Sequence, residues 1–266
     1  MAAGHLAAGA EEMNDAESAG APKTLAIDIG GTGLKAAVLD ATGKMVTKRA
    51  RVPTPNPCPP EILVTDLAKL VAPLPPHDRI SIGFPGVVRD GRIITAPHFA
   101  DKAWVNYPLE QAISSSLGKP ARLLNDAEVQ GLGIVAGQGL EVVLTLGTGV
   151  GSAIFSNGAL TPHLELAHHP IRKDMTYNDY VGNAARRALS KKKWNDRVLK
   201  TIEIVYDLLH YDVLYVGGGN AANITVKLPD NVRIASNDAG LTGGIRLWDD
   251  DVWKAVCGIR AANPVH

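Results

Sequence analysis

Cysteine is scarce in this sequence, and neither an excess of one charge nor a long apolar run is present. Cys58 and Cys257 are too few and too far apart for a disulfide framework or a cysteine zinc site. No apolar run approaches the roughly 20 residues that a membrane-spanning helix needs. The 27 basic and 27 acidic side chains balance, so bulk charge gives no reason to expect nucleic acid or a membrane as partner. We therefore expect a cytoplasmic globular protein.

The first 22 residues contain no Lys or Arg and are rich in Ala, Gly and Glu. A signal peptide begins with a basic segment, so we expect residues 1–23 to form a flexible tail instead. The rest of the chain is long enough for one large domain or two ordinary ones.

Strand and helix patterns alternate after this tail, which predicts an α/β architecture. Asp90-Gly91 predicts a tight hairpin within 87–95, because this dipeptide adopts the positive φ angles of such turns. The patterns predict strands at 24–29, 34–39, 44–52, 79–85, 121–126, 141–147, 212–218 and 232–236, and helices at 61–72, from about 108, at 127–137, 176–190, 194–209 and 239–248.

A Gly-Thr-Gly turn occurs twice, each time between two strand patterns. GGTGLKAAVL at 30–39 aligns with LGTGVGSAIF at 146–155, and a second turn follows each copy. A common β-turn explains either copy alone. Two copies at matching places favour a duplication, so we expect one domain at 24–125, another at 126–266, and a cleft between them.

The glycine turns have the composition of anion-binding loops but do not match a P-loop. Glycine lets the backbone approach an anion closely and turn its N–H groups toward it. Lys35 is explained equally well as a phosphate-binding cation and as a solvent-facing strand residue. The predicted phosphate-binding residues are Gly30, Gly31, Thr32, Gly33, Lys35, Gly147, Thr148 and Gly149.

Asp28 stands directly before the first glycine turn. A carboxylate repels a bare phosphate, but a divalent cation between the two removes the repulsion. Mg²⁺ binds carboxylates and phosphate oxygens and keeps several waters. The pattern therefore predicts Mg²⁺ as cofactor and Asp28 as its protein ligand.

Asp28-x-Gly-Gly-Thr-Gly followed by a second Gly-Thr-Gly strand pair resembles the actin-like ATPase superfamily, and within it the ROK family of sugar kinases and repressors. The resemblance extends from residue 24 to about 248. It implies a two-domain actin-like (ribonuclease H-like) sugar kinase fold with an interdomain cleft. The two glycine hairpins are then the first and second phosphate-binding segments.

Asn125-Asp126 ends a predicted strand and begins a helix. Asp is a common N-cap residue at such a place. The matching Asn-Asp of ROK kinases includes the catalytic aspartate, so the resemblance implies that Asp126 is the base that orients and deprotonates a sugar hydroxyl. Asn125 is then a sugar contact.

Three further segments resemble the sugar-binding motifs of the family. GFPG at 83–86 matches the Gly-x-Pro-Gly loop and implies a role for Gly86. HLELAHH at 163–169 matches the Glu-x-Gly-His segment, with Ala167 in the glycine position, and implies that Glu165 and His168 bind sugar hydroxyls. His98 takes the position where the family often has Asn. The histidine cluster is also compatible with a plain surface cluster or a metal site.

The chain departs from many ROK proteins in having no cysteine in PIRKDMTYNDYVG at 170–182, which argues against zinc. This short format most resembles the bacterial polyphosphate glucokinase and glucomannokinase branch. Residues 186–200 carry seven basic side chains and one acidic one. Such a stretch suits a long polyanion such as polyphosphate, and suits equally the solvated face of two helices.

DVLYVGGGNAA at 212–222 reads as strand, glycine turn and helix. The resemblance implies that Gly217, Gly218, Gly219 and Asn220 bind adenosine. Gly217-x-Gly219-x-x-Ala222 also fits a dinucleotide fingerprint, so an NAD-dependent oxidoreductase is a rival hypothesis.

We expect a kinase that transfers a phosphoryl group from polyphosphate, ATP or both to a hexose, with glucose O6 as the first choice. Mannose, fructose or an N-acetylated hexosamine is the alternative acceptor, and a sugar-binding protein without catalysis is the alternative class. A repressor is disfavoured, because the 23 residues before Thr24 lack helix-turn-helix character. Homodimers are usual in the family, although the sequence itself gives no signal for one.

Overall fold

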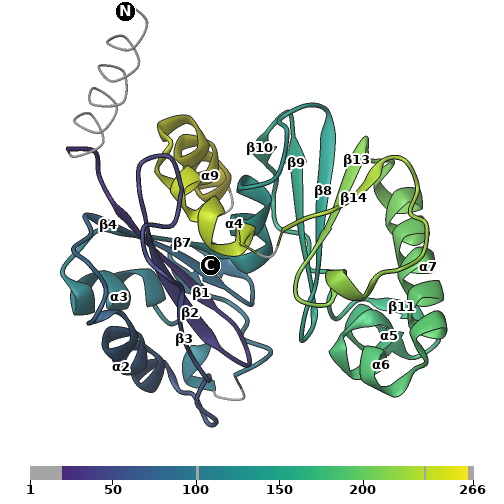
Figure 1. Cartoon of the computed structure of the whole chain (residues 1–266), viewed down its shortest axis with the longest axis horizontal. Coiled ribbons are helices and arrows are strands. Elements are labelled where there is room, and N and C mark those ends of the chain that lie inside the picture. The colour runs from purple at the N-terminus through teal and green to yellow at the C-terminus, as the bar shows by residue number, and fades with distance from the viewer. Residues whose placement is uncertain (1–19, 100–101, 237, 263–266) are drawn as a thin grey trace, which may run out of the picture.

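The computed structural model describes residues 20–99, 102–236 and 238–262 (Figure 1). Most of the predicted tail, residues 1–19, lies outside them. Two five-stranded sheets stand side by side, and helix α4 (Asp126–Leu132) lies between them. No helix in the described part of the chain is long and apolar enough to span a membrane.

The first sheet has the strand order β3-β2-β1-β4-β7. β1 pairs antiparallel with β2 and parallel with β4, which pairs parallel with β7. Helices α2 (Pro60–Val71) and α3 (Leu109–Leu117) pack against it through a shared apolar core. The strands are β1 (Thr24–Ile29), β2 (Leu34–Leu39), β3 (Ala50–Val52), β4 (Arg79–Phe84) and β7 (Ala121–Asn125).

The second sheet repeats this arrangement with the order β10-β9-β8-β13-β14. β8 pairs antiparallel with β9 and parallel with β13, so the two Gly-Thr-Gly turns join equivalent strands. Helix α7 (Lys191–Leu209) covers its outer side. The strands are β8 (Leu140–Leu146), β9 (Val150–Ser156), β10 (Ala159–Leu160), β13 (Val213–Gly217) and β14 (Val232–Ile234).

The remaining elements are short. Asp90 and Gly91 both have positive φ in the hairpin of β5 (Val88–Arg89) and β6 (Arg92–Ile93), which confirms the predicted tight turn. The others are η1 (Lys102–Trp104), β11 (Pro170–Arg172), β12 (Met175–Thr176), α5 (Tyr177–Val181), α6 (Asn183–Ala188) and η2 (Ala221–Asn223).

Helix α4 contacts strands of both sheets, and its apolar side chains form one core cluster with Phe155 and Val143 of the second sheet. Gly131 makes this approach possible: a Cβ on it would overlap the Phe155 ring. The helix is therefore held between the halves at van der Waals distance, with Asp126 at its first position.

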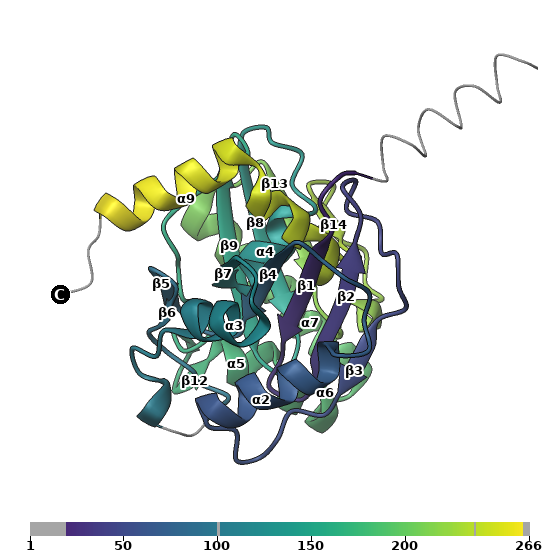
Figure 2. The ribbon, with the colours of Figure 1, turned by 90° about the vertical axis from the view of Figure 1, so that its left-hand side faces the viewer.

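Elements late in the chain return to the first sheet (Figure 2): α8 (Ala239–Thr242) and η3 (Gly243–Trp248) contact β1. Helix α9 (Asp250–Ala262) packs on η3 and on β10 of the second sheet, with its Trp253 ring against Arg122 of β7. The Ser81 hydroxyl on β4 donates to the Gly244 carbonyl at 2.6 Å, and the Trp248 indole donates to the Ser81 hydroxyl at 2.9 Å. The predicted boundary at residues 125 and 126 separates the two sheets, but residues 239–262 pack against the first half as well.

Several predicted elements differ in extent. The helix predicted at 127–137 ends at Leu132, because the Glu141 carboxylate accepts the N–H groups of residues 136–138. The helix predicted at 176–190 breaks at Gly182, whose ψ of 178° is extended. The third strand covers only Ala50–Val52, the predicted helix 239–248 is largely 3₁₀, and α9 was not predicted.

Candidate active site

A cleft of about 490 Å³ lies between the two halves, as predicted. Both glycine turns, the start of α4 and loops from each half line it. His168 and Gly217 are the predicted site residues that the structure leaves off its walls. The predicted residues that do line it are Asp28, Gly30, Gly31, Thr32, Gly33, Lys35, Gly86, His98, Asn125, Asp126, Gly147, Thr148, Gly149, Glu165, Gly218, Gly219 and Asn220.

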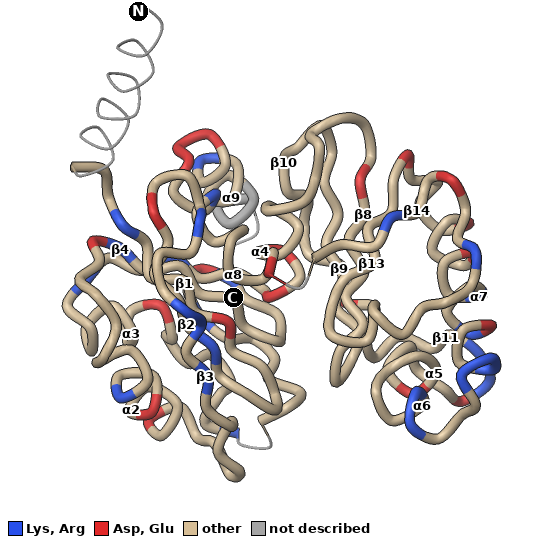
Figure 3. Tube along the Cα trace, viewed as in Figure 1, with Lys and Arg blue, Asp and Glu red and all other residues tan. Residues whose placement is uncertain are grey.

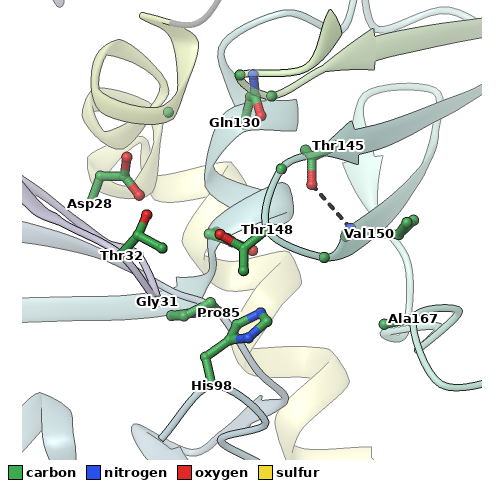
Figure 4. Close-up of a pocket in the computed structure, with 18 of the residues that line it drawn as sticks. Asp28, Gly31, Thr32, Pro85, His98, Gln130, Thr145, Thr148, Val150 and Ala167 are labelled. Carbon is green, nitrogen blue, oxygen red and sulfur yellow. Dashed lines mark hydrogen bonds between the residues drawn. The ribbon is translucent and has the colours of Figure 1, made fainter. Parts of the chain in front are cut away.

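The first glycine turn, residues 30–33, closes the β1–β2 hairpin. The Gly30 N–H donates to the Gly33 carbonyl at 3.0 Å, and the Thr54 hydroxyl donates to the Gly30 carbonyl at 2.6 Å. The N–H groups of Gly31 and Thr32 donate to no acceptor among the described residues. This turn therefore presents free donors and the exposed Thr32 hydroxyl to the cleft (Figure 4).

The second glycine turn, residues 147–149, lies on the opposite wall. Asn178 of α5 supports it, since its Oδ1 accepts the Val150 N–H at 2.7 Å. A Cβ on Gly149 would lie 2.7 Å from the same oxygen, so any larger residue would displace the Asn178 amide that supports the turn. Within the described residues, the N–H groups of Thr148 and Gly149 have no acceptor. The two turns thus offer matching sets of anion-binding groups across the cleft.

Asp28 lies at the edge of the first turn. Its Oδ2 accepts a hydrogen bond from the Lys35 ammonium at 2.7 Å, and the two residues are register partners on β1 and β2. In the described part of the chain no donor is bonded to Oδ1. Lys35 therefore faces the cleft and not bulk solvent alone.

No group of three or more His, Cys, Asp or Glu side chains in the described ranges is arranged to hold a metal ion. A site closed by protein ligands is thus not formed there. One carboxylate beside a turn with free N–H groups fits the way Mg²⁺ is held in phosphate complexes, through few protein oxygens plus phosphate oxygens and waters. Asp28 meets that requirement.

Asp126 is the first residue of α4 and lines the cleft together with both turns. Its Oδ1 accepts the N–H of Ala127 at 2.8 Å. Burial raises the pKa of Asp126, and the charges of Asp28, Glu128 and Glu165 raise it further, to about 7. A carboxylate with this pKa is suited to accept a proton near neutral pH.

Asn125 is the N-cap of α4. Its Oδ1 accepts the Ala127 N–H at 2.9 Å, and its Nδ2 donates to the Gly86 carbonyl at 3.1 Å. The cap role considered for Asp126 therefore belongs to Asn125. This leaves the second oxygen of Asp126 for the cleft, and it ties the predicted Gly86 loop to the same point.

His163 was not predicted as a site residue, but it lines the cleft. Its Nδ1 lies 2.9 Å from Glu128 Oε1, and its Nε2 lies 3.6 Å from Glu165 Oε2. The other oxygen of Glu165 accepts the Ala167 N–H at 2.9 Å. The predicted sugar ligand Glu165 is therefore fixed from two sides.

His168 is exposed and lies off the cleft wall, so the structure does not place it as the sequence predicted. The Leu166–His169 turn, in which the His169 N–H donates to the Leu166 carbonyl, carries it outward. His98 does line the cleft, and its ring packs so closely on Gly31 that a Cβ there would lie 2.9 Å from it (Figure 4). Burial lowers the pKa of His98, and His168 lowers it further, so the ring is neutral near pH 7.

The turn after β13 adjoins the second glycine turn. Asn220 Nδ2 donates to the Gly147 carbonyl at 2.9 Å, while Gly218 has a φ of 81° and abuts the Leu146 backbone. Gly217 is the buried end of the strand behind Gln130 and does not reach the cleft. Only the three-residue 3₁₀ helix η2 follows. A dinucleotide fingerprint requires a full helix there, so the oxidoreductase reading fails.

Basic side chains reach the cleft from β3 and its preceding loop, which the sequence analysis did not single out. Arg49 and Arg51 line it together with Lys35, and Arg51 is the register partner of Lys35. Figure 3 shows Lys and Arg positions in blue along β2 and β3. The basic stretch 186–200 covers α6 and the start of α7 and does not line the cleft.

Comparison with known proteins identifies the family. The model of the ROK family matches residues 24–165. Polyphosphate glucokinase of Mycobacterium tuberculosis is 31% identical over 233 residues, which cover 82% of this chain and 88% of that protein. The chain belongs to the ROK family.

Solved structures of ROK proteins confirm the predicted fold class. An inorganic polyphosphate/ATP-glucomannokinase from Arthrobacter sp. strain KM has a TM-score of 0.76 and 29% identity, over 91% of this chain and all of that one. A ROK family glucokinase from Streptomyces griseus in complex with glucose and AMPPNP has a TM-score of 0.69 over 85% of this chain and 98% of that one. At 19% identity, this second likeness shows the fold alone.

Several cleft residues of this ROK-family chain had no signal in the sequence. His163 is one of three histidines in HLELAHH, whose order does not show which one turns inward, and Asn178 is brought beside the second glycine turn only by folding. One signal was present: Asn125-x-x-Glu128 is a capping box, which places Glu128 beside the cap and makes it a partner for a neighbouring cation. The other unpredicted residues discussed above are Arg49, Arg51 and Gln130.

Proposed function

We propose that this protein is a hexose kinase that transfers a phosphoryl group from polyphosphate or ATP to O6 of glucose. The observation that carries the proposal is that Asp126 and both glycine turns line the same cleft. Sugar and donor phosphates then meet at one carboxylate, which is the arrangement that phosphoryl transfer to an alcohol requires.

The acceptor binds on the side of the cleft that carries Asn125, Glu165 and His98. Carboxylate, amide and neutral imidazole groups can each donate to or accept from sugar hydroxyls. Asp126 accepts the proton of the reacting hydroxyl, because its pKa of about 7 leaves a useful fraction ionised at neutral pH.

The donor lies along the two turns. The free N–H groups of residues 31–32 and 148–149, with the Thr32 and Thr148 hydroxyls, bind its phosphate oxygens. The sugar oxygen forms a bond to the terminal phosphorus while the bond from that phosphorus to the bridging oxygen breaks. The bridging electron pair leaves with ADP or with polyphosphate shortened by one unit.

Asp28 holds the magnesium complex of the donor. Bound Mg²⁺ supplies charge neutralisation and orientation of the phosphates. Lys35, which is bonded to Asp28, adds a cation beside the first glycine turn and contributes to binding the donor phosphates.

Two classes of relative bear on the acceptor. The polyphosphate glucokinase match covers most of both chains, whereas N-acetylmannosamine kinase of Escherichia fergusonii is 37% identical over only 52% of this chain and 48% of that protein. Glucose is therefore our first acceptor. The second match makes an N-acetylated hexosamine the competing one.

A coupled assay tests the proposal. Purified protein is offered glucose, mannose, fructose and N-acetylmannosamine against ATP and polyphosphate, with Mg²⁺. We expect glucose 6-phosphate with at least one donor, and Asp126→Asn should lower kcat by about 10²- to 10⁴-fold while glucose still binds. Glucose binding without turnover by the wild type would instead favour the non-catalytic sugar-binding protein.

A further inference from the structure

His163 lies between two carboxylates that belong to different parts of the fold. Glu128 is the third residue of α4, and Glu165 follows His163 in the segment after β10. The imidazole side chain is 12% exposed, and the Glu128 side chain 7%. A hydrogen-bond network so well buried has few alternative partners.

Both oxygens of Glu128 are in use. Oε2 accepts the Asn125 N–H at 3.1 Å, and Oε1 lies 2.9 Å from His163 Nδ1. The α4 cap is thereby joined to the imidazole, so the position of His163 is set by the same helix start that carries Asp126.

The proton count determines the charge of His163. An ionised Glu128 can only accept, so Nδ1 carries a proton. In a neutral ring, Nε2 would then present a lone pair to the Glu165 carboxylate 3.6 Å away. No group among the described residues, Glu165 included, lies within hydrogen-bond distance of this buried nitrogen. Only the imidazolium, with both nitrogens protonated, is attracted to both neighbours.

The titration of the group agrees with this geometry. Burial alone lowers the pKa of His163, but the bonds and charges of Glu128 and Glu165 outweigh it and raise the pKa to about 9. For Glu165 the directions are reversed. Burial raises its pKa, but the contacts with His163 and with the Ala167 N–H outweigh burial and lower it.

We propose that His163 is a positioning residue of the acceptor site, an imidazolium that bridges Glu128 and Glu165 and holds the Glu165 carboxylate on the cleft wall. The proposal deepens the proposed function and rests on it, because it takes Glu165 as a sugar ligand. His163 acts through Glu165 and does not itself need to touch the sugar.

The bridge also acts on the electrostatics of Asp126. Glu128 and Glu165 both raise the pKa of Asp126, and a cation between them offsets part of their field. The ionisable groups that face Asp126 or Glu165 from the packed elements are Asp28 on β1 with Lys35 on β2, Glu128 on α4, His163, and the two histidines His98 and His168.

Kinetics of His163→Gln with glucose as the varied substrate test the proposal. We expect the glucose KM to rise roughly tenfold, with a smaller change in kcat, and the acid limb of kcat/KM to move to higher pH. His169→Gln is the matched control, because His169 is exposed and lies off the cleft; its kinetics should equal the wild type.

A double-mutant cycle separates positioning from general destabilisation. If His163 acts through Glu165, adding His163→Gln to Glu165→Gln should leave the glucose KM close to that of Glu165→Gln alone. An unchanged KM in His163→Gln, or losses that multiply independently in the double variant, would overturn the proposal.

Nitrogen-15 NMR of the unliganded full chain gives a readout that does not depend on activity. The His163 resonances, assigned by their absence in His163→Gln, should show two protonated ring nitrogens at about pH 7.5. A neutral ring there overturns the bridge even if the chain is a sugar kinase. An imidazolium in a chain without kinase activity leaves the bridge intact and refutes the proposed function instead.

Discussion

The Lys35 ammonium lies 2.7 Å from Asp28 Oδ2, and the two side chains sit directly opposite each other on neighbouring strands. The pair places one cation and one carboxylate at the entrance to the first glycine turn. Removing the carboxylate and removing the ammonium change the charge beside that turn in opposite directions. Single substitutions of the two residues can therefore separate their roles in phosphate binding.

Asp28→Asn should raise the Mg²⁺ concentration needed for half-maximal activity by roughly 10- to 100-fold, because the carboxylate charge that attracts the ion is lost. Lys35→Met should leave the Mg²⁺ requirement near that of the wild type. Titration of activity with Mg²⁺ at saturating sugar measures both. Asp66→Asn on α2, a half-buried carboxylate that lies off the cleft, is the matched control, and equal effects of Asp28→Asn and Asp66→Asn would contradict the role of Asp28.

The pH dependence of kcat/KM should follow the ionisation of Asp126. Its pKa of about 7 lies above that of an ordinary Asp, and the base is active only when deprotonated. Activity should therefore fall as the pH drops below about 7, by about tenfold per pH unit at the acid end. A profile that stays flat down to pH values near an ordinary Asp pKa of about 4 would remove Asp126 from this role.

Arg51→Gln should weaken donor binding, because the guanidinium faces the cleft beside Lys35. Loss of one charged phosphate contact should raise the donor KM roughly tenfold and make it less sensitive to salt. Steady-state kinetics with ATP and with polyphosphate at several salt concentrations measure this effect.

Arg187→Gln is the counterpart, because Arg187 is exposed in the basic stretch 186–200 and lies off the cleft. If that stretch is only a solvated face, Arg187→Gln leaves both donor KM values unchanged. A rise of the polyphosphate KM alone would show that this basic stretch binds the polyphosphate chain outside the cleft.

Gly131→Ala should destabilise the protein by about 1–3 kcal/mol. Its new methyl group meets the Phe155 ring and Val143, which are packed in the core between the halves. Gly258→Ala in α9 meets nothing within 4 Å and should be neutral or stabilising by up to about 1 kcal/mol. Urea unfolding measures the free energy of unfolding of both variants. Similar values would show that α4 can shift to accommodate the methyl group at little cost.

The parts of the site that depend on local sequence were predictable. A glycine turn after an apolar strand keeps its geometry wherever it is placed, so both phosphate-type turns were found at their correct positions. Asp126 was located at a strand end for the same reason, although the cap proved to be Asn125. Local spacing could also have found α9, since Asp250 and Asp251 precede apolar residues four apart at 252 and 256.

The parts that depend on how distant segments meet were not predictable. Three histidines occur in residues 163–169, and nothing in their order tells which one turns inward. The motif resemblance favoured His168, but the ionised oxygens of Glu128 and Glu165 make an inward position favourable for His163. Arg51 likewise became a cleft residue only because β3 pairs with β2 in the observed register.

The return of residues 239–248 to the first sheet bears on how the polypeptide folds during synthesis. Leu241 completes an apolar cluster with Ala26, Ala37 and Leu39. The Ser81 hydroxyl on β4 donates to the Gly244 carbonyl. During ribosomal synthesis, the amino-terminal half of the nascent polypeptide must keep that surface bare until residues 239–248 have left the ribosome. Its folding can thus be completed only after the second sheet has been synthesised.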